Sequence, residues 1–171
     1  VQARERINGR DEAMVVDISA LLTELAADFS FQGEAERKTV RTRLGEGLAV
    51  HGQAGLLQRL FGNILSNAMF YTPPDAEVHL EAALDNGNLR VRVRDFGPGV
   101  PEDQLEDIFR AFYRVDGSRS RQSGGAGLGL AMAREAALWH GGSIIARNAS
   151  PGLELIVTLP ANGLGHKDPR Q

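Results

Sequence analysis

Apolar residues recur at every third or fourth position in three stretches of the chain, and this spacing predicts three amphipathic helices. The stretches span residues 17–29, 53–71 and 126–140. Asp17 is suited to cap the first helix, because its carboxylate can accept backbone N–H groups of the first turn. Pro73 cannot continue the second helix, and Gly141 suits the end of the third. We therefore expect three main helices separated by other elements.

Runs of alternating apolar and polar residues between these helices predict strands. The strands are expected at residues 39–44, 78–84, 89–95, 144–146 and 153–159, with 48–51 as a short partner strand of the first. Segments 85–88 and 149–152 have the composition of hairpin turns. Pro101 is expected to open a short helix through Ile108. This order of elements predicts an α+β fold, a two-layer α/β sandwich in which about three helices cover one face of a mixed, mostly antiparallel sheet.

Composition excludes several classes of protein. The chain has 171 residues, of which 42% are hydrophobic and 24% charged, which suits one globular domain. Its net charge of −3 gives no basic field for nucleic acid. It contains no cysteine, which excludes disulfides and thiol catalysis. It also lacks a run of about 18 apolar residues, so we expect no membrane contact by this chain.

The two ends of the chain are more polar than its middle. We expect the domain itself to span residues 13–161. Residues 1–12 are polar and begin with Val rather than Met, which favours a linker from an upstream part of a longer protein. Residues 162–171 are rich in Gly, Pro and polar residues and are expected to form a flexible tail.

The most informative segment is the glycine-rich stretch at residues 123–131, SGGAGLGLA, where the third helix begins. Glycines allow a backbone to approach a ligand without side chains in the way. A helix N-terminus offers free N–H groups and the positive end of the helix dipole. Together these features predict a phosphate-binding site.

Two asparagines on the second helix are candidates for metal or phosphate binding. Asn63 and Asn67 are four residues apart and therefore share one face of the helix. Their side-chain carbonyls can ligate Mg²⁺, and their amides can hydrogen-bond a phosphate. The alternative interpretation is a pair of ordinary asparagines on a helix surface.

Asp95 ends a predicted strand and runs directly into Phe-Gly-Pro-Gly. A carboxylate in this position can accept a hydrogen bond from the exocyclic amine of adenine. Gly97 and Gly99 leave room for a flat ring beside it. A plain turn is the alternative, because Asp, Gly and Pro are the usual residues of turns.

These motifs together resemble the ATP-binding catalytic domain of sensor histidine kinases, in the superfamily that includes gyrase, Hsp90 and MutL. The resemblance rests on four ordered segments that look like the family's N box, first glycine box, phenylalanine box and second glycine box: GNILSNAMFYT, DFGPGV, IFRAFYR and GGAGLGLAM. It covers residues 11–160 and implies the Bergerat-type ATP-binding fold, with ATP and Mg²⁺ as cofactors.

The resemblance also implies a role for each matching position. Asn67, assisted by Asn63, would coordinate the Mg²⁺ ion and carry the catalytic role. Asp95 would bind the adenine amine. The other residues implied to contact the nucleotide lie along its ring, in its lid or around its phosphates: Tyr71, Gly97, Gly99, Val100, Phe112, Arg114, Arg119, Gly125, Gly127, Leu128, Gly129 and Leu130. Phe109 would anchor the base of the lid with Phe112, and simple core packing is the alternative for both.

Three positions depart from the patterns of the superfamily. Phe70 stands where the family often has Lys or Arg, and Ala126 stands where it usually has Thr. Asn63 occupies the position at which gyrase-like ATPases carry a general-base Glu. An amide cannot take a proton from water, so we expect poor hydrolysis and favour phosphoryl transfer to an acceptor.

The phosphoacceptor itself is expected on another domain, because none of the four histidines lies in the family's H-[ED]-x-x-x-P pattern. We interpret His140 as structural. The resemblance implies a dimerisation and phosphoacceptor domain of the same protein and a response regulator as partners, with this chain alone a monomer. It also implies a site on the cytoplasmic side of a protein anchored in the bacterial inner membrane. An anti-sigma-factor-type serine kinase and a degenerate nucleotide-sensing module are the alternatives.

Overall fold

The computed structural model describes residues 13–115 and 127–161, which fold into two layers. The strands are β1 (Met14–Asp17), β2 (Thr39–Leu44), β3 (Ala49–Gly52), β4 (Glu77–Asp85), β5 (Asn88–Arg94), β6 (Ser143–Asn148) and β7 (Leu153–Pro160). The helices are α1 (Ile18–Gln32), α2 (Ala54–Tyr71) and α3 (Gly129–Trp139), with single 3₁₀ turns at Glu34–Glu36, Glu102–Gln104 and Asp107–Phe109.

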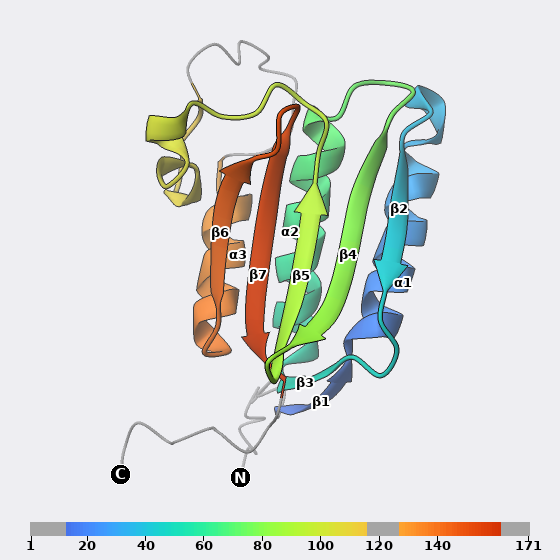
Figure 1. Ribbon diagram of the computed structural model, residues 1–171, viewed down its shortest axis with the longest axis vertical. Coiled ribbons are helices and arrows are strands. Elements are labelled where there is room, and N and C mark those ends of the chain that lie inside the picture. The colour runs from blue at the N-terminus through green and yellow to red at the C-terminus, as the bar shows by residue number, and fades with distance from the viewer. Residues whose placement is uncertain (1–12, 116–126, 162–171) are drawn as a thin grey trace, which may run out of the picture.

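The main sheet has five strands in the order β2-β4-β5-β7-β6. β2 and β4 run parallel, and every other pair in this sheet is antiparallel. The three α-helices of the described residues lie on one face of the sheet and leave the other face uncovered (Figure 1). The expected two-layer α/β sandwich is therefore confirmed.

The core lies between the helices and the covered face of the sheet. α2 runs through the middle of the helical layer, and its Leu57, Phe61 and Ile64 are completely buried. Val91 of β5 and Leu159 of β7 meet them from the sheet side and are equally inaccessible. Burying each such side chain stabilises the fold by roughly 1.5–3 kcal/mol. No helix in the described part of the chain has the length and apolarity that crossing a membrane requires.

The expected pairing of residues 48–51 with 39–44 is wrong. β3 instead pairs with β1, a strand that the sequence pattern did not predict, in a separate two-stranded sheet. β2 pairs with β4 because their register sets apolar partners in one row, such as Val40 beside Val78. Parallel strands need a long crossover, which β3 and α2 provide.

Two helix predictions also need correction. The short helix expected at 101–108 is instead a pair of separate 3₁₀ turns, because so few residues cannot stabilise an α-helix by themselves. The third helix begins at Gly129 rather than at residue 126, which lies outside the described residues. Gly127 has a φ of +72°, a left-handed conformation that cannot belong to an α-helix.

The N-cap of α1 gives a direct test of the fold. Asp17 accepts a hydrogen bond from the Ala20 N–H at 2.9 Å, as the sequence predicted. We expect Asp17→Ala to lower the free energy of unfolding by about 1 kcal/mol, measured by urea denaturation. Asp28→Ala is the matched control, because Asp28 lies exposed on the same helix, and it should stay within about 0.5 kcal/mol of wild type. Equal losses in the two variants would contradict the capping role.

Candidate functional site

A buried carboxylate lies directly after β5, at the edge where the sheet meets the loop that follows. Asp95 is only 3% exposed. Its Oδ1 accepts two backbone hydrogen bonds, from the N–H groups of Gly97 and Leu153, each at 3.0 Å. Its Oδ2 accepts none from any residue that the structure describes. One oxygen is thus fixed by two backbone N–H groups, and the other has no donor among the described residues.

Burial raises the pKa of the Asp95 carboxyl above its ordinary value, because removal from water disfavours the charged form. The N–H groups of Leu153 and Gly97 and the positive charge of Arg94 act in the opposite direction but do not cancel the effect. A further hydrogen-bond donor at Oδ2 would stabilise the carboxylate. The site is therefore suited to a ligand that brings an N–H group.

The loop after Asp95 runs so close to neighbouring backbone that it requires glycine twice. A Cβ on Gly97 would lie 2.6 Å from the Tyr71 carbonyl oxygen. Gly99 has a φ of +74°, and a Cβ there would lie 2.7 Å from Asn148 Oδ1. The buried Thr72 fixes the start of the loop, because its Oγ1 accepts the Phe96 N–H at 3.2 Å.

Asn148 holds the far end of this loop. Its Oδ1 accepts the Val100 N–H at 2.9 Å, and its Nδ2 donates to the Val100 carbonyl and to Glu102 Oε1. Val100 itself packs against the hydrophobic core. Sequence reasoning missed Asn148, since nothing in the pattern of β6 connects it to residues 48 positions away.

Asn63, the first asparagine of the pair on α2, faces the beginning of α3. A Cβ placed on Gly129, the first residue of α3, would lie 3.8 Å from the Asn63 Cβ and 3.9 Å from its Oδ1. Asn67 lies one turn further along α2 and is half-buried like Asn63. No side chain of the described residues caps the N-terminus of α3. This end of α3 therefore keeps N–H groups that can meet an anion.

The two phenylalanines proposed for the base of the lid differ in their surroundings. Phe109 is buried, with the Arg134 guanidinium 5.4 Å from its ring centroid, so the core-packing interpretation fits it. Phe112 is 70% exposed and has a φ of 63°, which core packing does not explain. Its N–H donates to the Gly127 carbonyl at 3.0 Å. This bond joins the two segments that flank residues 116–126.

The remaining residues implied to bind a nucleotide differ in exposure where the structure describes them. Leu128 and Leu130 are half-buried, and Leu130 packs against the core. Tyr71 is exposed at the end of α2, with its ring edge-on to Phe70 at a centroid distance of 4.9 Å. Arg114 is exposed. Arg119, Gly125 and Ala126 lie outside the described residues.

Two further residues make contacts that the sequence did not reveal, Gly152 at the site and His140 between α3 and α2. Gly152 has a φ of +90°, and a Cβ there would lie 1.8 Å from the Asp95 carbonyl oxygen. Its only signal in the sequence was a Pro-Gly turn. His140 accepts the Gln53 N–H at Nε2 and contacts the Ala136 carbonyl through Nδ1 at 2.6 Å, which joins the end of α3 to the start of α2. These contacts agree with its structural interpretation.

Comparison with known proteins identifies the class to which this geometry belongs. Residues 52–163 match the family described as histidine kinase-, DNA gyrase B- and HSP90-like ATPase. The chain belongs to this family of ATPases, and the resemblance to the ATP-binding catalytic domain of sensor histidine kinases is confirmed.

Curated relatives carry the comparison further. The sensor-like histidine kinase SenX3 of Mycolicibacterium smegmatis is 34% identical over 144 residues, and the sensor protein VanS of Enterococcus faecium is 36% identical over 146. The signal transduction histidine-protein kinase BaeS of Escherichia coli is 35% identical over 147 residues. The alignments cover 84%, 85% and 85% of this chain but 37%, 38% and 31% of the relatives. The chain thus spans about a third of their length.

Solved structures share the fold. The mycobacterial sensor histidine kinase MprB has a TM-score of 0.76 at 24% identity, with 88% of this chain and 98% of that chain covered. Full-length ShkA has a TM-score of 0.75 at 29% identity, with 86% and 31% covered. The likeness therefore extends over most of the described residues.

Gly152 provides a test of the contact behind Asp95. We expect Gly152→Ala to force the turn away from Asp95 and to lower the free energy of unfolding by at least ~2 kcal/mol more than Gly47→Ala. Gly47 is the matched control, because it has a φ of +66° but an added Cβ would meet nothing within 4 Å. Its alanine variant should lose only the ~1 kcal/mol of left-handed strain. Similar losses in both variants would show that the close approach to Asp95 has no consequence.

The raised pKa of Asp95 predicts a pH dependence of stability. A carboxyl whose pKa is higher in the folded than in the unfolded protein destabilises the fold as pH rises through the two values. We therefore expect Asp95→Asn to be as stable as wild type or more stable at pH 7, with the difference shrinking as pH falls towards about 4. Thermal unfolding across this range measures it. An advantage of Asp95→Asn that grows as the pH falls would contradict the assigned cause.

Proposed function

We propose that this chain is the Mg²⁺-ATP-binding catalytic domain of a two-component sensor histidine kinase. It would transfer the γ-phosphoryl group of ATP to a histidine on a separate dimerisation domain. The observation that carries the proposal is the Asp95 carboxylate, with one oxygen fixed by two N–H groups and the other without a donor among the described residues. The adenine amine would supply that donor. The complex of full-length ShkA, a similar structure, with AMPPNP also supports it.

The residues of the candidate site fit the two ends of an adenine nucleotide, its base and its phosphates. The amine would bond to Asp95 Oδ2, and the ring would lie beside Gly97, where a side chain has no room. The phosphates would lie towards the uncapped N-terminus of α3, beside Asn63. Gly127, Gly129 and Arg114 would contribute to that end, as would Arg119 and Gly125 beyond the described residues.

Magnesium fits the donor set of α2. The amide oxygens of Asn63 and Asn67 are hard ligands of the kind that Mg²⁺ prefers alongside phosphate oxygens. Within residues 13–115 and 127–161 there is no cluster of three His, Cys, Asp or Glu side chains that could hold a metal alone. The ion would therefore depend on the nucleotide for part of its coordination, and it would neutralise charge on the phosphates.

Transfer, rather than hydrolysis, follows from the chemistry of residue 63. Asn63 lies against the start of α3 with an amide where a general base for water would be needed. The domain would hold the nucleotide in position and stabilise charge, and it would leave the acceptor histidine to supply the nucleophile.

The proposal includes the surroundings of the domain. Residues 13–161 would form the catalytic domain, residues 1–12 the linker to the dimerisation and phosphoacceptor domain, and residues 162–171 the tail. A response regulator would receive the phosphoryl group afterwards. The whole protein would be anchored in the bacterial inner membrane, with this domain on the cytoplasmic side. The sensor kinases among the relatives support this arrangement.

A calorimetric titration of the domain with AMPPNP, with and without Mg²⁺, tests nucleotide binding. We expect Mg²⁺-dependent binding that Asp95→Asn and Asn67→Ala each weaken at least about tenfold, because each loses a charge-assisted or metal contact. Ser66→Ala is the control, because Ser66 is exposed on the same helix next to Asn67. Unchanged affinity in both site variants would overturn the proposed site.

Phosphoryl transfer needs its own assay. With labelled ATP, a supplied helical domain carrying the phosphoacceptor histidine should become labelled, and its His→Ala form should not. The label should be stable to base and labile to acid, as expected for phosphohistidine. Labelling of serine would favour the serine-kinase alternative, and binding without transfer would favour a nucleotide sensor.

A further inference from the structure

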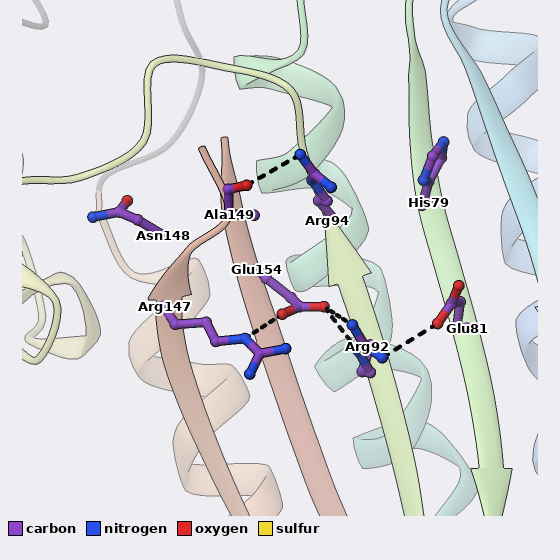
Figure 2. A pocket seen from close by; sticks show the side chains of 8 residues that line it. All are labelled: His79, Glu81, Arg92, Arg94, Arg147, Asn148, Ala149 and Glu154. Carbon is purple, nitrogen blue, oxygen red and sulfur yellow. Dashed lines mark hydrogen bonds and ion pairs between the residues drawn. The ribbon is translucent and has the colours of Figure 1, made fainter. Parts of the chain in front are cut away.

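Arg94, the last residue of β5, and Asp95, which follows it, have their side chains on opposite faces of the sheet. Successive side chains along a strand alternate between its two faces, so Arg94 and Asp95 point apart. Figure 2 shows Arg94 on the face that no helix covers, where it lines a depression of about 420 Å³. Asp95 is buried on the other side. The turn at residues 149–152 accepts hydrogen bonds from Arg94, and Leu153, directly after this turn, donates its N–H to Asp95.

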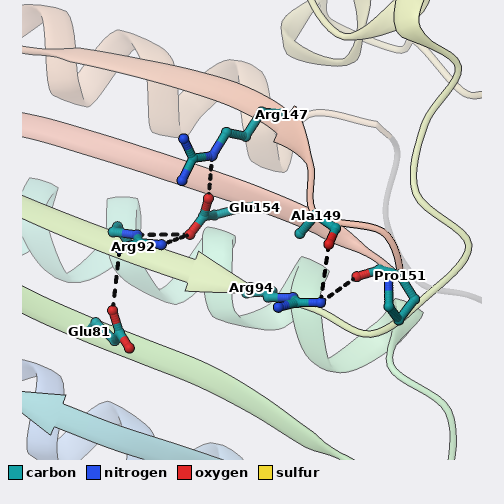
Figure 3. A network of polar contacts seen from close by, with 7 residues as sticks. All are labelled: Glu81, Arg92, Arg94, Arg147, Ala149, Pro151 and Glu154. Atoms are coloured by element: carbon teal, nitrogen blue, oxygen red, sulfur yellow. Dashed lines mark hydrogen bonds and ion pairs between the residues drawn. The ribbon is translucent and has the colours of Figure 1, made fainter.

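The other arginines of this depression are paired with carboxylates. Glu154, whose side chain is only 6% exposed, bonds to Arg92 at 2.8 Å and to Arg147 (Figure 3). Burial would raise the pKa of Glu154, but its bonds to Arg147 and Arg92 hold the pKa below the ordinary value. Arg92 also lies 3.6 Å from Glu81. These charges therefore satisfy one another.

Arg94 bonds to backbone instead. Its Nη2 donates to the Ala149 carbonyl at 3.3 Å and to the Pro151 carbonyl at 3.0 Å (Figure 3). Its guanidinium carbon lies 4.4 Å from the centre of the Phe96 ring. No carboxylate among the described residues lies within ion-pair distance of it. Among the described residues, the guanidinium thus hydrogen-bonds to the turn and forms no ion pair with a neighbouring carboxylate.

That turn supports the base-binding end of the proposed nucleotide site. Leu153, directly after the turn, donates its N–H to Asp95 Oδ1 and accepts the Asp95 N–H at 2.9 Å. Gly152 packs against the Asp95 backbone. Asn148, directly before the turn, holds Val100 at the far end of the loop. A shift of the turn would move both the carboxylate and the loop.

We propose that Arg94 is a positioning residue for adenine recognition, acting through the 149–152 turn from the opposite face of the sheet. This inference rests on the proposed function for its ligand, but the contacts that carry it belong to the chain alone. Arg94 bonds to two carbonyls of the turn, and the residues that flank the turn, Leu153 and Asn148, hold Asp95 Oδ1 and Val100.

The test compares Arg94→Ala and Arg94→Lys with Arg90→Ala. Arg90 is a close match, because it lies on the same strand and face, has a buried Nε without an acceptor like Arg94, and contacts Asp85 rather than the turn. Thermal unfolding first establishes that each variant is folded. Arg94→Lys keeps the positive charge near Asp95 but cannot reproduce the guanidinium geometry.

The first readout uses the protein without nucleotide. We expect Arg94→Ala to raise the amide hydrogen-exchange rates of Gly97, Val100 and Leu153 about tenfold, because their bonds to Asp95 and Asn148 depend on the turn. Arg94→Lys should raise them less, and Arg90→Ala should leave them unchanged. Wild-type exchange at all three amides in Arg94→Ala, or full restoration by Lys, would overturn the proposal.

The second readout is the ratio of affinities for ADP and for inosine diphosphate, which lacks the amine. Arg94→Ala should reduce this ratio about tenfold, through loss of ADP binding, whereas Arg90→Ala should preserve it. An unchanged ratio in Arg94→Ala would also overturn the inference. If wild type binds neither nucleotide, the proposed function fails, and the exchange rates alone still decide whether Arg94 positions the turn.

Discussion

The candidate site depends on one constraint, the burial of a single carboxylate of which only one oxygen is hydrogen-bonded by the described residues. Asp95 Oδ1 accepts two N–H groups from separate parts of the chain, and Oδ2 accepts none among the described residues. A buried carboxylate with an unused acceptor is costly unless a ligand supplies the donor. The raised pKa of the group expresses that cost. Much of the surrounding structure keeps this arrangement in place.

The sheet contributes through both of its faces. On the covered face, Asn63 of α2 lies beside the start of α3, which no side chain of the described residues caps. On the uncovered face, Arg94 holds the turn that supports Asp95 from behind. A purely local description of the site would miss this second face, because its residues contact no part of the proposed ligand.

Local sequence signals predicted most of the fold because they arise from neighbouring residues. Helical periodicity and caps identified α1 and α2, and alternation identified β2, β4, β5 and β7. The pairing of β1 with β3 was missed because it joins short strands by register, which no local pattern encodes. In the candidate site, Asp95 and the glycines at 97 and 99 were recognised because they form a local motif. Asn148, Gly152 and Arg94 were not, because their importance comes from contacts about 50 to 60 residues away.

The most direct test of this account changes the ligand and leaves the protein intact. Affinities of the wild-type domain for ADP and for purine riboside diphosphate, which has hydrogen in place of the exocyclic amine, isolate the contact to Asp95 Oδ2. A loss of at least about tenfold on removing the amine is predicted, because the hydrogen bond is made to a buried, charged acceptor. Equal affinity for the two nucleotides would contradict the claim that Asp95 recognises the base.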